Sequence, residues 1–248
     1  YNGDVYISGD ERSSGSNSVS KVWKNGVATT LPIDTFDYTA VASLKVINGD
    51  VYVTGYGEKY IAATSTYISK AIYWKNGVLN VLTTQDNRGE GYGIFSVNGD
   101  VYITGDDKLY SQPYQHAVYW KNGIKTDLPL TGNYLSSNGY SIFIDNTDVY
   151  TAGALYYSNF SSSTYTNAGF WKNNTANLLT NYTTNYTDAE TYDIFVKNNI
   201  VYTVGEINAN NGNGPYTKSP LYFQNGVPVP LNGITAGQDA GAYSIFVK

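Results

Sequence analysis

The sequence predicts an all-β fold: a five-bladed β-propeller with four antiparallel strands in each blade. Three observations predict it: a unit that occurs five times, two tight turns in each unit, and chain ends that complement each other. With Val5 as a marker, the unit recurs at Val51, Val101, Val149 and Val201, in steps of 46, 50, 48 and 52 residues. Repeats of roughly 40 to 50 residues with four strands each are typical of propeller blades.

The turns are the clearest part of each unit. Asn-Gly supplies the two residues with positive φ that a type I′ hairpin turn requires. The first turn is at Asn2-Gly3, Asn48-Gly49 and Asn98-Gly99, and it is degenerate at Asn146-Thr147 and Asn198-Asn199. The second is at Asn25-Gly26, Asn76-Gly77, Asn122-Gly123 and Asn225-Gly226, and it is degenerate at Asn173-Asn174. Two hairpins in each unit predict four strands.

The third unit defines the strands best. We expect them at 92–97, 101–105, 117–121 and 124–128. These runs are continuously apolar or β-branched, whereas a strand with one face in water would alternate with polar residues. The pattern therefore predicts sheets that are covered on both faces, as stacked blades are.

The two chain ends predict how the ring closes. Residue 1 enters at the first turn with no strand before it, and residues 243–248 have the pattern of a first strand with nothing after it. We expect this C-terminal strand to pair with the N-terminal blade, which removes an open sheet edge. No Pro-rich, Ser-rich or charged linker divides residues 1–248, so we expect a single domain.

Composition excludes several classes of protein. Cysteine and methionine are absent, which excludes disulfides and thiolate metal sites. With 15 Lys and Arg against 20 Asp and Glu, the net charge of −5 argues against nucleic-acid binding. No apolar stretch reaches 18 residues, so membrane insertion is not expected. The 26 Tyr and the charged fraction of 14% favour a secreted or cell-surface protein.

The direction of the strands predicts where function lies. Both tight turns of each unit fall on one face, and the longer, more variable connections fall on the other. Because binding residues are usually carried by loops on a rigid scaffold, we expect the long-loop face to bind a ligand. The candidate ligand-binding residues on it are Tyr56, Tyr60, Tyr110, Tyr114, His116, Tyr156, Tyr157, Tyr216, Arg88, Glu90 and Asp239.

Positions that recur in most units are predicted to serve the scaffold. Packing is expected for Trp23, Trp74, Trp120 and Trp171, and for the Ile-Phe pairs that begin at Ile94, Ile142, Ile194 and Ile245. Asp4, Asp50 and Asp100 are expected to accept hydrogen bonds from nearby backbone N–H groups. Packing is also favoured over a site role for Tyr92, Tyr140, Tyr192 and Tyr243; Ala42 breaks this series and Lys45 breaks the Phe series.

Catalytic patterns are weak in this sequence. His116 is the only histidine, so neither a Ser-His-Asp arrangement nor a His/Cys metal site is expected, and no cofactor is predicted. An oxygen-only calcium site around Asp106-Asp107 stays open. A glycosidase would need two of the carboxylates Glu90, Glu190, Asp188, Asp193 and Asp239 at a defined separation. Solvated loop charges are the favoured interpretation, and a protein that is not an enzyme is expected.

Two resemblances bear on function. The strand Asp-Val-Tyr-(Ile/Val)-(Thr/Ser)-Gly, followed by Tyr-Trp-Lys-Asn-Gly, resembles the repeats of secreted or lipid-anchored bacterial β-propeller proteins over essentially the whole chain. In blade number and unit length the chain is similar to five-bladed tachylectin-type lectins, which bind amino sugars. The strand motifs of those lectins are absent, so no sugar-binding residue is carried over.

The leading hypothesis is a non-catalytic extracellular binding module that recognises a glycan or a cell-surface partner. A structural subunit of an extracellular assembly is one alternative, and it leaves a homo-oligomer open. A carbohydrate-active enzyme is the other alternative.

Overall fold

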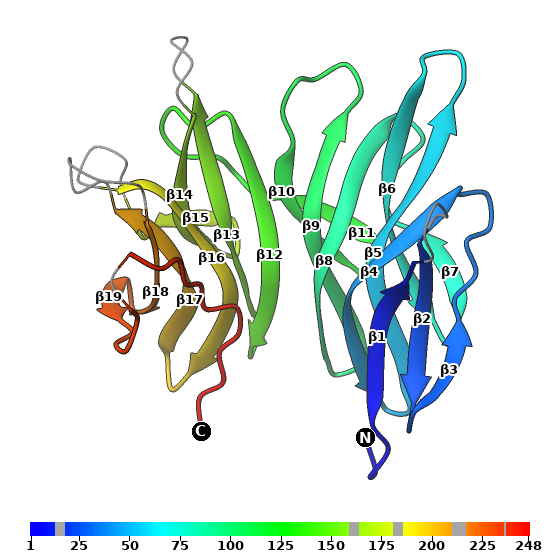
Figure 1. Cartoon of the computed structure of the whole chain (residues 1–248), viewed down its shortest axis with the longest axis horizontal. Helices are drawn as coiled ribbons and strands as arrows, with labels where there is room; N and C mark the ends of the chain where they lie inside the picture. The colour runs from blue at the N-terminus through cyan, green and yellow to red at the C-terminus, as the bar shows by residue number, and fades with distance from the viewer. Residues whose placement is uncertain (13–17, 159–163, 181–185, 210–216, 236) are drawn as a thin grey trace. The chain divides into compact units, whose positions relative to one another are not determined.

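A computed structural model describes residues 1–12, 18–158, 164–180, 186–209, 217–235 and 237–248. The described part of the chain contains nineteen β-strands, and every regular element in it is a strand (Figure 1). None of the described residues forms a helix long and apolar enough to span a membrane. The all-β class is therefore confirmed.

The chain divides into two compact units, residues 1–126 and 127–248, and each is described by itself. The prediction of one domain stays a prediction. The strands of the first unit are β1 (Tyr6–Glu11), β2 (Val19–Lys24), β3 (Val27–Thr30), β4 (Tyr38–Ile47), β5 (Asp50–Ile61), β6 (Thr66–Lys75), β7 (Val78–Val81), β8 (Asn87–Val97), β9 (Asp100–Leu109), β10 (His116–Lys121) and β11 (Ile124–Asp127). Those of the second are β12 (Ser136–Asp145), β13 (Asp148–Ser158), β14 (Thr164–Lys172), β15 (Thr175–Leu178), β16 (Tyr186–Lys197), β17 (Ile200–Ala209), β18 (Thr217–Gln224) and β19 (Val227–Pro230).

The strands form antiparallel sheets of the kind that make propeller blades. Strands β4 to β7 form one four-stranded sheet in sequence order, and β8 to β11 form another. In the second unit, β12 to β15 and β16 to β19 repeat this arrangement, and a single parallel pair, Thr166 and Asp188, joins the two groups. Strands β1 to β3 form a three-stranded sheet.

The Asn-Gly turns are confirmed. Asn48 and Gly49 have φ values of 51° and 90°, and every asparagine that opens a predicted turn, including the degenerate ones, has positive φ. The expected role of Asp4, Asp50 and Asp100 is wrong in its partners. Asp50, for example, accepts a hydrogen bond from Asn76 Nδ2 and forms an ion pair with Lys75. Asn76 Oδ1 accepts a hydrogen bond from the Val51 N–H. The side chains of the second turn thus bind the first turn.

The expected loops on the long-loop face are too long. The strands predicted at 92–97 and 101–105 are longer in the structure: β8 begins at Asn87, and β9 runs on to Leu109. A β-bulge between Gly91 and Gly93 interrupts β8, and residues 87–91 before it are polar or glycine. A run of polar residues and glycines has the composition of a loop, so the sequence does not reveal this part of β8. Arg88 and Glu90 therefore lie on a strand and not on a loop.

The packing predictions are confirmed for most of the repeated positions. Trp74, Trp120 and Trp171 are fully buried, and Ile94, Ile142 and Ile194 are buried with them. The C-terminal strand expected at 243–248 is not assigned as a strand. Within the second unit, Ser244 and Ile245 instead donate hydrogen bonds to the carboxylate of Asp193.

Candidate functional site

A β-bulge recurs in the first strand of four sheets and determines which side chains meet. The residue left unpaired is Ala42, Tyr92, Tyr140 or Tyr192. Two residues before the unpaired residue, the backbone carbonyl lies so close to a glycine of the next strand that a Cβ atom there would be 1.9 Å from the carbonyl oxygen. Cross-strand neighbours just beyond this glycine are Glu90 with Asp106 in β8–β9, and Glu190 with Glu206 in β16–β17. Two of the sheets therefore place a pair of carboxyl groups beside the bulged tyrosine.

The pair in the second unit is joined through Tyr192. The Tyr192 hydroxyl interacts with both Glu190 and Glu206, and Lys218 of β18 forms an ion pair with Glu206. The Glu206 side chain is 7% exposed. Burial raises the pKa of Glu190, and the charge of Glu206 raises it further. The site therefore contains one carboxyl held by a cation and one with an increased affinity for a proton.

These carboxyl groups line a cavity. Its volume is about 270 Å³, and its walls come from β14, β16, β17 and β18: Thr166, Asp188, Ala189, Glu190, Glu206, Asn208 and Lys218. Small-molecule sites usually have volumes of about 300 Å³ or more, so this cavity suits a compact ligand. Asp188 is fixed at its wall, since Asp188 Oδ1 accepts the backbone N–H of Thr166 at 3.1 Å.

The pair in the first unit shares a single hydroxyl group. Tyr92 Oη lies 3.1 Å from Glu90 Oε2 and 3.0 Å from Asp106 Oδ2. A phenol has one proton to donate, so the second hydrogen bond requires a proton on one of the carboxyls. Burial and the charge of Glu90 raise the pKa of Asp106 to about 7. Asp106 is 7% exposed, and its raised pKa favours a shared proton in this pair near neutral pH.

The first-unit pair continues into a row of polar side chains. Ser69 Oγ lies 3.2 Å from Glu58 Oε1 and 3.5 Å from Glu90 Oε1, and Tyr38 donates a hydrogen bond to Glu58. Burial raises the pKa of Glu90, and the charge of Glu58 adds to the effect. Glu90 is consequently harder to ionise than a carboxyl in water.

The other two bulges carry neutral side chains. In β12–β13, Tyr140 Oη and Tyr156 Oη are 2.8 Å apart, and Asn138 replaces the first glutamate. In β4–β5, Ala40 and Tyr56 occupy the two acidic positions. The fold therefore does not require an acid at these positions. Glu90, Asp106, Glu190 and Glu206 occur only in the β8–β9 and β16–β17 hairpins among these four.

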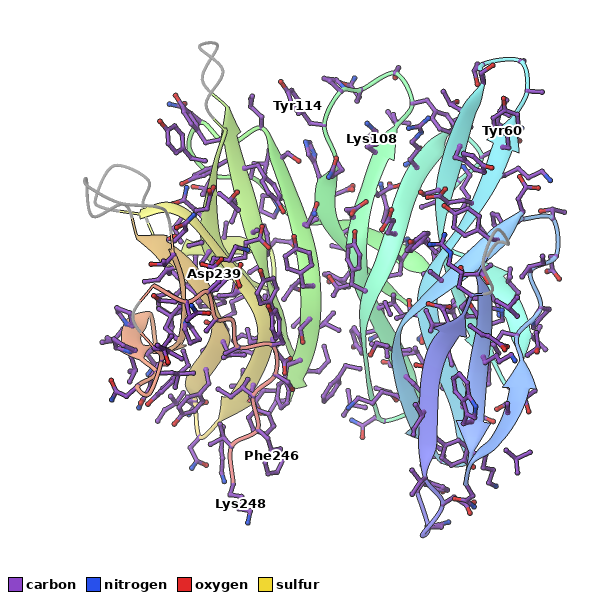
Figure 2. All side chains as sticks on the ribbon, viewed as in Figure 1. Tyr60, Lys108, Tyr114, Asp239, Phe246 and Lys248 are labelled. Atoms are coloured by element: carbon purple, nitrogen blue, oxygen red, sulfur yellow. The ribbon has the colours of Figure 1, made fainter. Side chains whose placement is uncertain are left out.

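The predicted ligand-binding residues fall into separate groups. Arg88 and Lys70 lie over the ring of Tyr110, at 5.4 and 5.2 Å from its centroid. Tyr60 and Tyr114 are about two-fifths exposed near the ends of hairpins β5–β6 and β9–β10 (Figure 2). His116 is exposed at the start of β10. Only Tyr56, whose pKa is raised by burial and the charges of Glu90 and Glu58, borders the first-unit acids.

In the second unit, Tyr157 lies 6.4 Å from Tyr134 and 6.5 Å from Tyr165, measured between ring centroids. Asp239 accepts the backbone N–H of Lys218 at 2.8 Å, which places it beside the second-unit pair. Tyr216 lies outside the described residues.

No group of three or more His, Cys, Asp or Glu side chains that could hold a metal ion is found among the described residues. At the suggested calcium position, Asp107 accepts hydrogen bonds from Asn87 Nδ2 and Lys125 Nζ, both at 2.6 Å, while Asp106 bonds to Tyr92. The two carboxyl groups therefore have separate protein partners.

Sequence reasoning missed Glu206 and Lys218 and assigned Tyr92 and Tyr192 to packing. A signal for the pairs is present in the repeats. Glu-x-Tyr occurs at Glu90 and Glu190, and the glycine at the end of the following strand is succeeded by an acid in Gly105-Asp106 and Gly205-Glu206. The two motifs lie on adjacent antiparallel strands, which brings the acids together.

The sequence matches no known family model and no curated protein. Among solved structures, the chain is similar to an exo-1,5-α-L-arabinanase from a bovine ruminal metagenomic library, with 11% identity, 94% coverage of both chains and a TM-score of 0.44. It is also similar to sucrose-6-phosphate hydrolase from Lactobacillus gasseri, with 12% identity, a TM-score of 0.49 and coverage of 93% of this chain. It spans only 58% of that hydrolase. The GH43 endo-arabinanase from Bacillus licheniformis aligns over 91% of this chain and 92% of its own, with 10% identity and a TM-score of 0.37.

These findings correct two expectations. The similar structures are glycoside hydrolases by name, in contrast to the non-catalytic module and the absence of enzymatic function expected from the sequence. At these identities and TM-scores the likenesses identify no acting residue. The expectation of solvated loop charges is wrong for Glu90 and Glu190, because both lie on strands and burial raises the pKa of each. Asp239 is exposed and lies outside the strands, as expected.

Proposed function

We propose that this protein is a carbohydrate-active hydrolase that cleaves glycosidic bonds with Glu190 and Glu206. The observation that supports this most directly is the cavity that both carboxyl groups line. Glycosidic cleavage needs a carboxylic acid that protonates the leaving oxygen and a second, ionised carboxylate. Environments that give neighbouring carboxyls different proton affinities provide such a pair.

The roles follow from the surroundings of each carboxyl. Burial keeps a proton on Glu190 at higher pH than in water, which suits a general acid. The Lys218 ammonium stabilises the ionised form of Glu206, which suits a base or nucleophile. Tyr192 fixes both carboxyls; its own pKa is raised by burial and by their charges, so it stays a hydrogen-bond donor.

The test is the release of reducing sugar from a panel of aryl glycosides and soluble polysaccharides. We expect wild type to cleave at least one, and Glu190→Gln and Glu206→Gln each to lower kcat at least about 100-fold. An aryl glycoside with a good leaving group should partly bypass Glu190→Gln, because such a leaving group needs no proton.

Glu11→Gln is the matched control, since Glu11 lies on β1 and pairs with Lys21. It should leave the rate unchanged. A wild-type protein inactive on the whole panel, or a Glu190→Gln variant as active as wild type, would refute the assignment.

We also propose that the repeats build five blades and that residues 241–248 add to β1 to complete the first. Gly9 of β1 supports this. It matches Gly55, Gly105, Gly153 and Gly205, where a Cβ would lie 1.9 Å from a carbonyl oxygen of the preceding strand; at Gly9 the nearest atom would be in the Trp23 ring, at 3.4 Å. A glycine is thus kept where the described sheet does not require one.

The proposed register places Ile245 opposite Ile7 and Phe246 opposite Tyr6, as Ile94 and Phe95 lie opposite Ile103 and Tyr102. Ile7 is 58% exposed and Phe246 is 75% exposed, so pairing would bury apolar surface from both.

A further inference from the structure

The C-terminal segment, residues 239–243, is packed against the Glu190–Glu206 pair. It runs from β18 towards β16 (Figures 1 and 2). Its start is fixed to β18 by two hydrogen bonds: the Lys218 N–H donates to Asp239 Oδ1 at 2.8 Å, and the Ala240 N–H donates to the Lys218 carbonyl at 2.9 Å. The residue whose ammonium pairs with Glu206 is therefore held on both sides of its backbone by this segment.

The middle and end of the segment contact the other parts of the pair. A Cβ atom on Gly241 would lie 2.7 Å from Glu206 Oε2 and 2.6 Å from Tyr243 Oη, so the segment passes directly over that carboxylate. The ring of Tyr243 lies 5.1 Å from that of Tyr192, centroid to centroid, at 33° between planes. Tyr192 in turn interacts with both carboxyls. The segment thus touches each member of the site except Glu190.

We propose that the C-terminal segment is part of the active site and that Asp239 is its positioning residue, which holds the Lys218 ammonium against Glu206. This inference rests on the proposed function for its catalytic meaning. With the ammonium in place, Glu206 has a cation as its partner, and Glu190 is the carboxyl with the raised pKa. With Lys218 released, the two glutamates compete for one proton, and neither has a fixed role.

The charged groups around the pair determine the direction of the effect. The charged groups are Asp188 on β16, Lys218 on β18 and Asp239, and the neutral titratable groups are the Tyr192 and Tyr243 hydroxyls. Lys218 is the only cation among them, and it lowers the proton affinity of Glu190. Moving it away leaves two carboxyls facing each other and Asp188, so the pair should hold its proton to higher pH.

The test is an NMR titration of the glutamate side-chain carboxyls in the full chain, which requires no substrate. Asp239→Ala should raise the apparent pKa of the pair by about one unit, as should Lys218→Met, which removes the cation directly. Asp239→Asn should titrate like wild type, because the amide oxygen still accepts the Lys218 N–H. Gly241→Ala should resemble Asp239→Ala, since its methyl group displaces the segment.

Gln238→Ala, a change at the exposed residue directly before the segment, is the control and should have no effect. If Lys218→Met shifts the titration and folded Asp239→Ala and Gly241→Ala do not, the positioning role is refuted. If Asp239→Ala and Gly241→Ala do not fold, the comparison of Asp239→Asn with wild type decides. A shift in the apparent pKa of the pair in Asp239→Asn would show that the charge of Asp239, and not its hydrogen bond, matters, and would refute the positioning role. A normal titration series without hydrolytic activity would refute the proposed function but leave the positioning role intact.

Discussion

A Cβ atom on Gly205 would lie 1.9 Å from the carbonyl oxygen of Glu190. This glycine is what allows β16 to pass close over β17 before its bulge at Tyr192. The close approach aligns Glu190 with Glu206 across the two strands and puts Tyr192 between them. A glycine within the second strand, Gly205 here and Gly105 in the third repeat, therefore controls where the acids lie, although it has no side chain of its own.

Gly205→Ala should consequently be among the most damaging single changes. Its methyl group would meet backbone rather than a flexible side chain, so the hairpin must shift, at a cost of about 3 kcal/mol or more in the free energy of unfolding. Chemical denaturation measures the loss. A loss below about 1 kcal/mol would contradict the close approach; Gly105→Ala, with the same 1.9 Å clash against Glu90, is the internal replicate.

Gly9→Ala tests the proposed closure of the ring. Within the described sheet, the new methyl group meets only the edge of Trp23 at 3.4 Å, an ordinary contact. If residues 241–248 pair with β1, the carbonyl of Gly241 should lie where that of Glu90 lies in the third repeat. We then expect Gly9→Ala to destabilise the protein as much as Gly105→Ala. A nearly neutral Gly9→Ala would contradict closure through this strand.

The repeats predicted the turns and the order of the strands because both depend on local chemistry. Asn-Gly gives positive φ irrespective of its surroundings, and each turn lies where the pattern put it. The acid pairs could not be found in the same way. Glu190 and Glu206 are 16 positions apart, and their meeting depends on a one-residue register shift at Tyr192 that no hydrophobic pattern records. The sequence does not reveal their burial, because the polar residues at the start of β16 have the composition of a loop.

The Asp106 carboxyl should make the protein less stable as the pH rises. Its pKa in the folded protein is about 7, against about 3.9 in an unfolded chain. Its contribution is therefore fully present below about pH 4 and is lost as the pH rises through 7. Because Asp106 is 7% exposed, the loss between pH 5 and 8 should reach a few kcal/mol.

Asp106→Asn should remove most of this slope, since an amide keeps a donor for Tyr92 at every pH. Urea denaturation at pH 5 and pH 8 measures it, with the exposed Asp34→Asn as control. A wild-type protein equally stable at both values would show that the proton is not held at Asp106.

Asn76 should matter more to the turns than its neighbour Lys75. Asn76 has a φ of 51°, and its Oδ1 accepts the Val51 N–H at 2.8 Å. Asn76→Ala therefore loses a hydrogen bond and strains the turn, and the two effects together should lower the free energy of unfolding by about 2 kcal/mol. Lys75 makes a surface ion pair with Asp50 at 3.0 Å, and such pairs are screened by water. Lys75→Ala should have the smaller effect in thermal unfolding, and it should shrink further at high salt. The reverse order would contradict this account.

The buried tryptophans should respond unequally to loss of their N–H groups. Trp74 Nε1 donates to the Pro32 carbonyl at 2.9 Å, and Trp171 Nε1 donates to the Pro129 carbonyl at 2.8 Å. Trp120 Nε1 has no partner among the described residues; the position equivalent to Pro32 and Pro129 is Thr83 there. All three rings are equally buried, so the packing lost in a change to Phe is similar.

Trp74→Phe should therefore cost about 1 to 2 kcal/mol more than Trp120→Phe, because only the first leaves a carbonyl without its donor. Denaturation of the two variants side by side measures the difference, with Trp171→Phe expected to match Trp74→Phe. Equal losses for Trp74 and Trp120 would mean that the Trp120 N–H is also satisfied, for example by a bound water.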